Sequence, residues 1–297
     1  MHSSSPALFL GVDGGATRSR ARIRDGAGRL LGEAEAGPAN TRLGLVQTLR
    51  EVLSAAEGAA AVAGLGDLAC LHAGLGLAGA TGREEVERIL AEPLPFASTV
   101  VDSDAYAAWL GACGGKDGAI LIVGTGSCGL AVVGGQRINV GGWGDVVSDD
   151  GSGNAIGRAA LRRALWALEG LAPAGALAEA ILAFFERDPE KMVAWAMAAT
   201  KTDFARFAPL VFEHAARRDP LALALVEEAA THIARMAGRL LDCGAPAVAL
   251  IGGLAEPIAP WLPQPLRGRL ATPLADAADG AILMARQALK GREGAVP

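Results

Sequence analysis

The stretch Leu10-Gly-Val-Asp13-Gly14-Gly15-Ala-Thr17-Arg-Ser19 ends an apolar run near the start of the chain, and it decides the fold. A second stretch of the same kind, Ile122-Val-Gly124-Thr125-Gly126-Ser127-Cys128-Gly129, opens the later half. In each, a buried strand runs into a glycine turn with hydroxyl side chains and continues as another strand. Glycine lets backbone N–H groups approach an anion closely and adopts the positive φ that a side chain disfavours. Two such loops in one chain predict a phosphate group that is bound from both sides.

The composition narrows the class of protein. A length of 297 residues is enough for two domains, each with its own core. The net charge of −5 argues against a nucleic-acid partner, and no apolar run approaches the ~20 residues that a membrane span needs. The first residues lack the charged segment of a signal peptide, and the four cysteines form no CxxC pair. We therefore expect a cytoplasmic protein with reduced thiols and no membrane partner.

Residues 1–113 are expected to form the first domain, in which three antiparallel strands are followed by alternating helices and strands. The strands are expected at residues 7–12, 18–24, 29–36, 71–77 and up to Asp102, and the helices at 43–63, 83–90 and 104–113. This order predicts an α/β domain with a mixed five-stranded sheet and helices on its faces.

Residues 114–297 open in the same way and are expected to form the second domain. Strands at 118–123, 130–133 and 136–140 repeat the three-strand opening, and the chain is then mostly helical as far as Asp242. A further buried strand at 246–251 ends at Gly252-Gly253. The final helix, about residues 276–290, is expected to pack back on the first domain. The repeated opening therefore indicates an internal duplication.

Asp13 stands at a strand end beside the first glycine turn. Its carboxylate could hold a magnesium ion through water molecules, because Mg²⁺ takes few carboxylates and keeps several waters. Thr17 and the backbone amides of the turn could then bind phosphate oxygens. The alternative is an ordinary tight hairpin with an Asp-Gly turn. The second loop at residues 124–127 has the same context, and this joint occurrence favours two phosphate loops.

Asp104 follows a predicted strand end and begins a helix. A role as helix N-cap would by itself explain an aspartate here. The functional alternative is a general base that takes a proton from a hydroxyl group attacking a phosphate. Asp102 is close enough in sequence to compete for that role. From these residues alone, the cap is the better-supported reading.

Residues 141–153 form the densest polar, glycine-rich run of the chain. Asp149 and Asp150 could complement the dipole of the following helix. They could also accept hydrogen bonds from sugar hydroxyls, with Trp143 as an apolar wall. Asn40 reads by default as a turn or N-cap residue. Gly252-Gly253 is either a plain turn or a place where a nucleotide base approaches the backbone.

Four arginines alternate along the second predicted strand. Arg18, Arg20, Arg22 and Arg24 share one face, whereas the residues between them share the other. We expect this arginine face to be solvated, with Arg18 alone as a candidate for phosphate contact.

Taken in order, these motifs resemble the actin/hexokinase/Hsp70-type ATPase superfamily, whose fold is a ribonuclease H-like duplication in two domains. Within it, the chain is similar to the BadF/BadG/BcrA/BcrD ATPase family and to its amino-sugar kinases, from residue 7 to about 290. The resemblance rests on Asp13-Gly-Gly-Ala-Thr17, the placement of Asn40, Leu75-Gly-Leu-Ala-Gly79, Thr125-Gly-Ser-Cys-Gly129, Ser148-Asp-Asp-Gly-Ser-Gly153 and Gly252-Gly253.

The resemblance implies a kinase that uses ATP and Mg²⁺ to phosphorylate the 6-hydroxyl of an amino sugar. It implies that Asp104 is the catalytic base and that Asp13 is linked to the metal. It assigns the nucleotide to Asp13, Gly14, Gly15, Thr17, Gly124, Thr125, Gly126, Ser127, Gly252 and Gly253. It assigns the sugar to Asn40, Asp104, Cys128, Gly142 and Asp149. A homodimer is the expected assembly.

Two departures from the family pattern bear on the sugar. Cys128 stands where animal-type N-acetylglucosamine kinases have an Asn that meets the sugar, and Asp150 stands where many members carry Glu. The first departure favours glucosamine, with its free amine, over N-acetylglucosamine, which is the alternative substrate.

Two other classes of protein fit the sequence less well. An ATPase that activates an iron–sulfur dehydratase or reductase would need cysteine pairs placed for a cluster. A sugar-sensing repressor would need a DNA-binding module, for which a first strand near residue 7 leaves no room.

Overall fold

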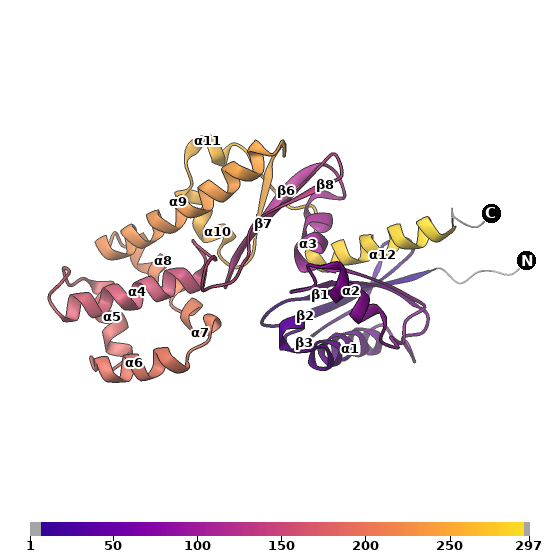
Figure 1. The fold of residues 1–297 in the computed structure, drawn as a ribbon, viewed down its shortest axis with the longest axis horizontal. Helices are drawn as coiled ribbons and strands as arrows, with labels where there is room; N and C mark the ends of the chain where they lie inside the picture. The colour runs from indigo at the N-terminus through magenta and orange to yellow at the C-terminus, as the bar shows by residue number, and fades with distance from the viewer. Residues whose placement is uncertain (1–6, 294–297) are drawn as a thin grey trace, which may run out of the picture. The chain divides into compact units, whose positions relative to one another are not determined.

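The computed structural model describes residues 7–293. They form two compact units, each with its own sheet (Figure 1). One unit comprises the described residues up to Lys116 together with those from Pro273 onward, and the other is Asp117–Thr272. The first unit is therefore discontinuous in sequence, whereas the second is one continuous segment.

The first unit is built on a mixed five-stranded sheet. Its strands are β1 (Leu8–Gly14), β2 (Ser19–Asp25), β3 (Leu30–Ala36), β4 (Leu71–Leu77) and β5 (Ser98–Ser103). They lie in the order β3-β2-β1-β4-β5; the first three are antiparallel neighbours, and β4 and β5 run parallel to β1. The helices are η1 (Thr41–Leu43), α1 (Leu45–Val62), α2 (Arg83–Leu90), α3 (Asp104–Cys113) and α12 (Ala277–Glu293).

The second unit repeats this sheet strand for strand. Its strands are β6 (Gly118–Val123), β7 (Ser127–Val133), β8 (Gln136–Gly141), β9 (Val248–Ile251) and β10 (Leu270–Ala271). Their order, β10-β9-β6-β7-β8, has the same antiparallel and parallel neighbours as the first sheet. The predicted α/β fold with a duplicated, mixed five-stranded sheet is thus confirmed.

Several helices lie between β8 and β9, and the last of them, α9 (Pro220–Asp242), packs on the second sheet. They are α4 (Gly153–Leu168), α5 (Ala176–Phe184), α6 (Pro189–Ala198), α7 (Lys201–Ala205), α8 (Ala208–Ala216) and α9; α10 (Ala255–Ile258), η2 (Ala259–Trp261) and α11 (Gln264–Arg267) follow β9. Their buried alanine, leucine and isoleucine side chains form one core with the sheet. Within the described residues, no helix has both the length and the apolar composition needed to cross a membrane.

Helix α12 packs on the first sheet through glycines rather than large side chains. Gly11 and Gly74 lie opposite each other on β1 and β4. A Cβ on Gly11 would stand 2.0 Å from the Ala278 carbonyl oxygen, and one on Gly74 would stand 1.9 Å from that of Ala281. The backbone of α12 can therefore lie directly on β1, whose carboxyl end carries Asp13.

Candidate active site

Three parallel strands bring aspartates to one edge of the first sheet. In the register of β1, β4 and β5, Asp13 lies beside Gly76, and Gly76 lies beside Asp102. Strand β5 ends at Ser103, and Asp104 follows as the first residue of α3. A Cβ on Gly76 would stand 2.4 Å from the Cβ of Ala107, so only glycine lets the first turn of α3 lie so close to β4. The carboxyl ends of parallel strands are a common place for ligand sites in α/β folds.

The carboxyl group of Asp13 lies in a strongly perturbing environment. Burial, and then the negative charge of Asp104, raise its pKa from the usual 3.8 to about 6, while Arg20 acts in the opposite direction. Two carboxylates that repel each other at a partly buried strand end fit a divalent cation, which would relieve the repulsion. In the part of the chain that the structure describes, no group of three or more His, Cys, Asp or Glu side chains forms a metal cage. Mg²⁺ is commonly held by one or two carboxylates together with water and phosphate, so the carboxylates of Asp13 and Asp104 are of the type that could hold it.

The turn after Asp13 is fixed by backbone hydrogen bonds. The Gly15 amide donates to the Arg18 carbonyl at 3.0 Å, and the Ala78 amide donates to the Gly14 carbonyl at 2.8 Å. Thr17 is exposed at the tip of this turn. These two hydrogen bonds fix the conformation of the turn. Because Thr17 is exposed, its hydroxyl is accessible to a phosphate.

Asn40 reaches the same edge of the first sheet. It forms an isolated parallel bridge with Ala78, which follows β4. Its carboxamide oxygen caps η1 by accepting a hydrogen bond from the Arg42 amide at 3.0 Å. The predicted N-cap role is therefore real. The NH₂ group of the carboxamide is the donor that Asn40 could offer to a ligand.

In the second unit, the N-terminus of α4 holds the glycine loop. The Gly153 amide donates to the Gly124 carbonyl at 2.8 Å, and the Asn154 amide donates to the Thr125 carbonyl at 3.2 Å. The loop carbonyls thus satisfy helix amides that would otherwise lack partners. Within the described residues, no backbone hydrogen bond uses the amides of Thr125 and Gly126. These two N–H groups could donate hydrogen bonds to a phosphate.

Asp149 supports this second loop from inside. It is buried, has a φ of 66°, and its carboxylate accepts a hydrogen bond from the Ser127 amide at 3.3 Å. A Cβ on Gly126 would stand 2.9 Å from the same carboxylate. The Ser127 hydroxyl donates to the Asp150 carbonyl at 2.8 Å. The sequence marked these residues as ligands of nucleotide and sugar, but it did not reveal that Asp149 contacts the loop.

The remaining predicted residues of the second unit lie next to the same loop. A Cβ on Gly142 would stand 2.7 Å from the Cβ of Cys128, the first residue after Ser127. At Gly252, a Cβ would stand 2.6 Å from the carbonyl oxygen of Val123, the last residue of β6. The structure therefore brings the predicted sugar-side and adenosine-side residues of this unit to the two flanks of its glycine loop.

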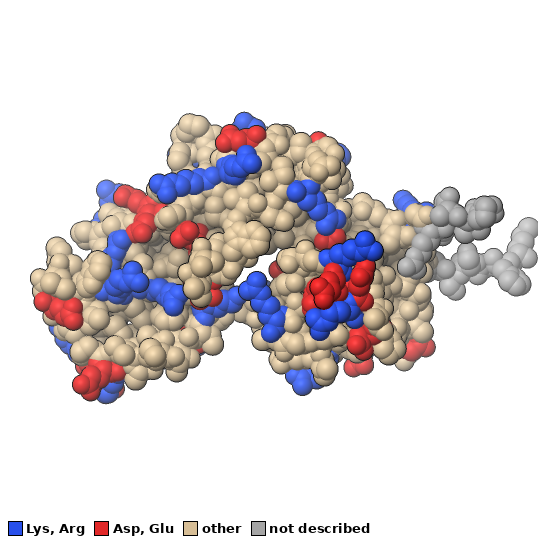
Figure 2. All heavy atoms as spheres, in the orientation of Figure 1, with Lys and Arg blue, Asp and Glu red and all other residues tan. Residues whose placement is uncertain are grey.

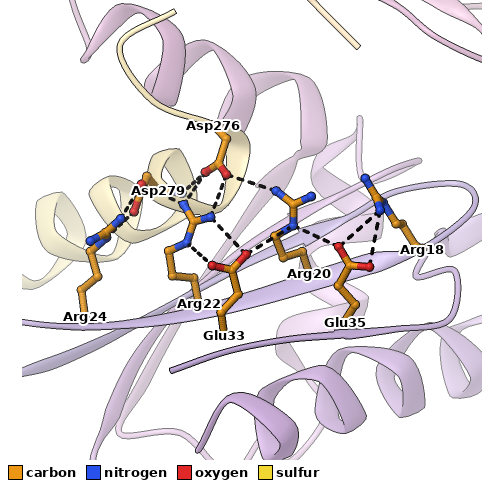
Figure 3. A network of polar contacts seen from close by, with 8 residues as sticks. All are labelled: Arg18, Arg20, Arg22, Arg24, Glu33, Glu35, Asp276 and Asp279. Atoms are coloured by element: carbon orange, nitrogen blue, oxygen red, sulfur yellow. Dashed lines mark hydrogen bonds and ion pairs between the residues drawn. The ribbon is translucent and has the colours of Figure 1, made fainter. Parts of the chain in front are cut away.

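The prediction of a solvated arginine face is wrong for Arg20, Arg22 and Arg24, which are partly or largely buried, whereas Arg18 is exposed. Arg18, which precedes β2, and the three arginines of β2 form a continuous ion-pair network with carboxylates of β3, with Asp276 just before α12 and with Asp279 in its first turn (Figure 3). The side chain of Arg22 is only 10% exposed. Figure 2 likewise shows acidic and basic side chains interspersed over the face in view. The members of the network are Arg18, Arg20, Arg22, Arg24, Glu33, Glu35, Asp276 and Asp279.

Part of this network had a signal in the sequence. Glu33 and Glu35 alternate on the next strand and lie opposite Arg22 and Arg20 in the register. Asp276 and Asp279 had no such signal in the sequence, because only the tertiary fold brings them next to β2.

Comparisons with known proteins agree with this arrangement. The chain is 39% identical over 279 residues to the glucosamine kinase GspK of Vibrio cholerae, covering 93% of this chain and 95% of that protein. A solved structure described as a proposed N-acetylglucosamine kinase of Chromobacterium violaceum matches with a TM-score of 0.89 and 37% identity, covering 95% of this chain and all of that one.

A third relative shows the fold alone. The ROK-family glucokinase of Streptomyces griseus, solved with glucose and AMPPNP, has a TM-score of 0.54 and 22% identity, with 94% of this chain and 99% of that chain covered. The model of the BadF/BadG/BcrA/BcrD ATPase family matches residues 10–285, which include both glycine loops and Asp104. The chain belongs to the BadF/BadG/BcrA/BcrD ATPase family.

Proposed function

We propose that this protein is an amino-sugar kinase that transfers a phosphoryl group from ATP to the 6-hydroxyl of glucosamine. The observation that carries the proposal is the 39% identity to a glucosamine kinase over 93% of the chain. The strand edge with Asp13 and Asp104 supports it, because phosphoryl transfer needs a positioned base and a place for a metal.

We propose Asp104 as the general base. Its place in the first turn of α3, just after the N-cap Ser103, holds the carboxylate at the strand edge beside Asp13. From there it would take the proton of the sugar hydroxyl as that oxygen attacks the γ-phosphate. General-base action of this kind contributes roughly 10²–10⁴-fold to a rate.

Asp13 is the residue proposed to hold magnesium, through water or directly, with the phosphates completing the coordination. When bound, the ion would neutralise charge on the transferring phosphate. The amides of Thr125 and Gly126, and the turn formed by Gly14, Gly15 and Thr17, are the proposed phosphate donors. Gly252 and Gly253 would lie against the adenosine.

The residues proposed to bind the sugar are Asn40, Asp104, Cys128, Gly142 and Asp149. N-acetylglucosamine is the second candidate, favoured by the similarity to the Chromobacterium structure. Cys128 supports glucosamine, because a thiol offers only a weak hydrogen bond to an acetamido group. We also propose that the protein is cytoplasmic and that it forms a homodimer. Sedimentation at micromolar concentration would test the dimer.

A sugar panel tests the proposed function. ADP release would be measured with glucosamine, N-acetylglucosamine, mannosamine and glucose at equal concentrations of MgATP. We expect the highest kcat/KM with glucosamine. A preference for N-acetylglucosamine would reverse the assignment of the sugar, and no turnover with any of the four would contradict the kinase function.

A further inference from the structure

Asp13 and Arg20 carry opposite charges and lie opposite each other on the adjacent strands β1 and β2, yet no ion pair joins them in the described structure. In the antiparallel register of β1 and β2 they are direct partners. Such partners share a face of the sheet, with Cβ atoms about 4.5–5.5 Å apart. Arg20 is also near enough to lower the pKa of Asp13. Nevertheless, the ion pairs of Arg20 among the described residues go to Glu33, Glu35 and Asp276.

Asp276 lies next to Arg20 in the structure, although 256 positions separate the two residues in the sequence. It immediately precedes α12, and its carboxylate accepts a hydrogen bond from the Asp279 amide at 3.1 Å, which anchors the first turn of the helix. The same carboxylate binds Arg22 at 2.7 and 2.8 Å and Arg20 at 3.2 Å (Figure 3). The two arginines are thus drawn toward the start of α12.

The two glutamates alone would not fix Arg20 in this way. They bind its Nε atom at 3.5 and 3.4 Å from the neighbouring strand, whereas Asp276 binds the terminal Nη1 atom. The Nη end is the mobile end of the side chain. Among the described residues, Asp276 is the one partner recorded for that end, and Asp13 is the carboxylate directly opposite Arg20 in the register of β1 and β2.

We propose that Asp276 is a positioning residue for Asp13: by holding Arg20, it keeps the Asp13 carboxylate available for a magnesium-bound nucleotide. The inference rests on the proposed function, since it takes Asp13 to be the residue that meets the metal. It assigns α12, whose residues are distant in sequence from the phosphate loop, a part in nucleotide binding. Arg20 then acts as a competing cation whenever Asp276 is lost.

The variant that tests the inference is Asp276→Asn. Asparagine caps a helix as well as aspartate does, so the start of α12 is kept while the charge is removed. Calorimetry would compare ADP binding with and without Mg²⁺, a readout that needs no sugar and no turnover. We expect Mg²⁺-dependent binding to weaken about two- to fivefold, the effect of one half-exposed ion pair, and binding without Mg²⁺ to change little.

The double variant Asp276→Asn/Arg20→Gln separates competition from structural damage. Removing the released arginine should restore Mg²⁺-dependent binding to the wild-type level, whereas damage to α12 would not be repaired by a second substitution. Asp279→Asn is the matched control, because Asp279 lies on the same helix and binds Arg22 and Arg24 but not Arg20. We expect this control to bind as the wild type does.

Three results would overturn the inference. They are an unchanged Mg²⁺ dependence in Asp276→Asn, the absence of rescue in the double variant, and an equal loss in Asp279→Asn. The proposed function fails separately: normal magnesium–ADP binding without phosphorylation of any sugar would overturn the kinase but leave the role of Asp276 standing. Wild-type protein that binds no ADP would overturn both.

Discussion

At the scale of the residue, the first unit concentrates its chemistry at the end of β1. Asp13 is partly buried beside Asp104, while Arg20, directly opposite it, is bound to other carboxylates. A carboxylate that is neither well solvated nor paired is costly to keep ionised. Such residues are candidates for function, because a bound cation or ligand can provide the favourable interaction that the carboxylate lacks in the protein alone.

The substitution Asp13→Asn measures how much stability the folded protein loses by keeping this carboxylate ionised. Since its pKa of about 6 in the folded protein exceeds the usual 3.8, the folded state binds the proton more tightly, and wild-type stability falls as the pH rises through 6. Asparagine does not ionise. Its free energy of unfolding should therefore exceed that of the wild type by about 1–3 kcal/mol near pH 8 and by only about 0.5 kcal/mol near pH 4.

Urea denaturation of the ligand-free protein at the two pH values gives this difference. The measurement near pH 4 is the internal control for any effect of the substitution apart from charge. Equal stability of the two proteins near pH 8 would mean that Asp13 is not held in an unfavourable environment.

At the scale of the element, α12 depends on the absence of side chains beneath it. On the sheet it lies against Gly11 and Gly74, where a Cβ would overlap the helix backbone. Because the obstacle is backbone and not a flexible side chain, the helix would have to move away as a whole.

Gly74→Ala should accordingly destabilise the first unit. We expect a loss of about 1–3 kcal/mol in the free energy of unfolding, the usual cost of overpacking. Gly66→Ala is the control, because a Cβ there would meet no atom within 4 Å. Thermal unfolding of the two variants measures the difference, and similar melting temperatures would show that α12 does not pack as described.

Elements differ in how well the sequence predicts them. The strands that lead into the glycine loops have apolar runs, and the residues at their ends could be found because parallel strands end at one edge. The charge network could not be found, because Arg22 binds Asp276, 254 residues away. The contact between Asp149 and Ser127 was likewise hidden, since it depends on a buried carboxylate in a positive-φ turn.

At the scale of the whole molecule, the two units share one sheet topology but differ in whether they are continuous in sequence. The second unit is the uninterrupted segment Asp117–Thr272, whereas the first needs the chain from Pro273 onward to cover its sheet. A single-chain enzyme with this arrangement need not unfold as one cooperative body.

Fragments of the chain test this difference. We expect residues 117–272 to fold alone, with cooperative thermal unfolding, because both the sheet and its helices are included. Residues 1–116 should fail to do so until residues 273–297 are added back, since α12 is absent. Circular dichroism melts distinguish the two cases, and cooperative unfolding of residues 1–116 alone would contradict the role of α12.

The central claim is that Asp104 is the base of an amino-sugar kinase, and turnover of Asp104→Asn with glucosamine and MgATP tests it most directly. We expect kcat to fall roughly 10²–10⁴-fold, while ADP affinity and melting temperature stay near those of the wild type, because asparagine keeps the shape of the side chain but cannot accept the proton. Turnover at the wild-type rate would contradict the claim.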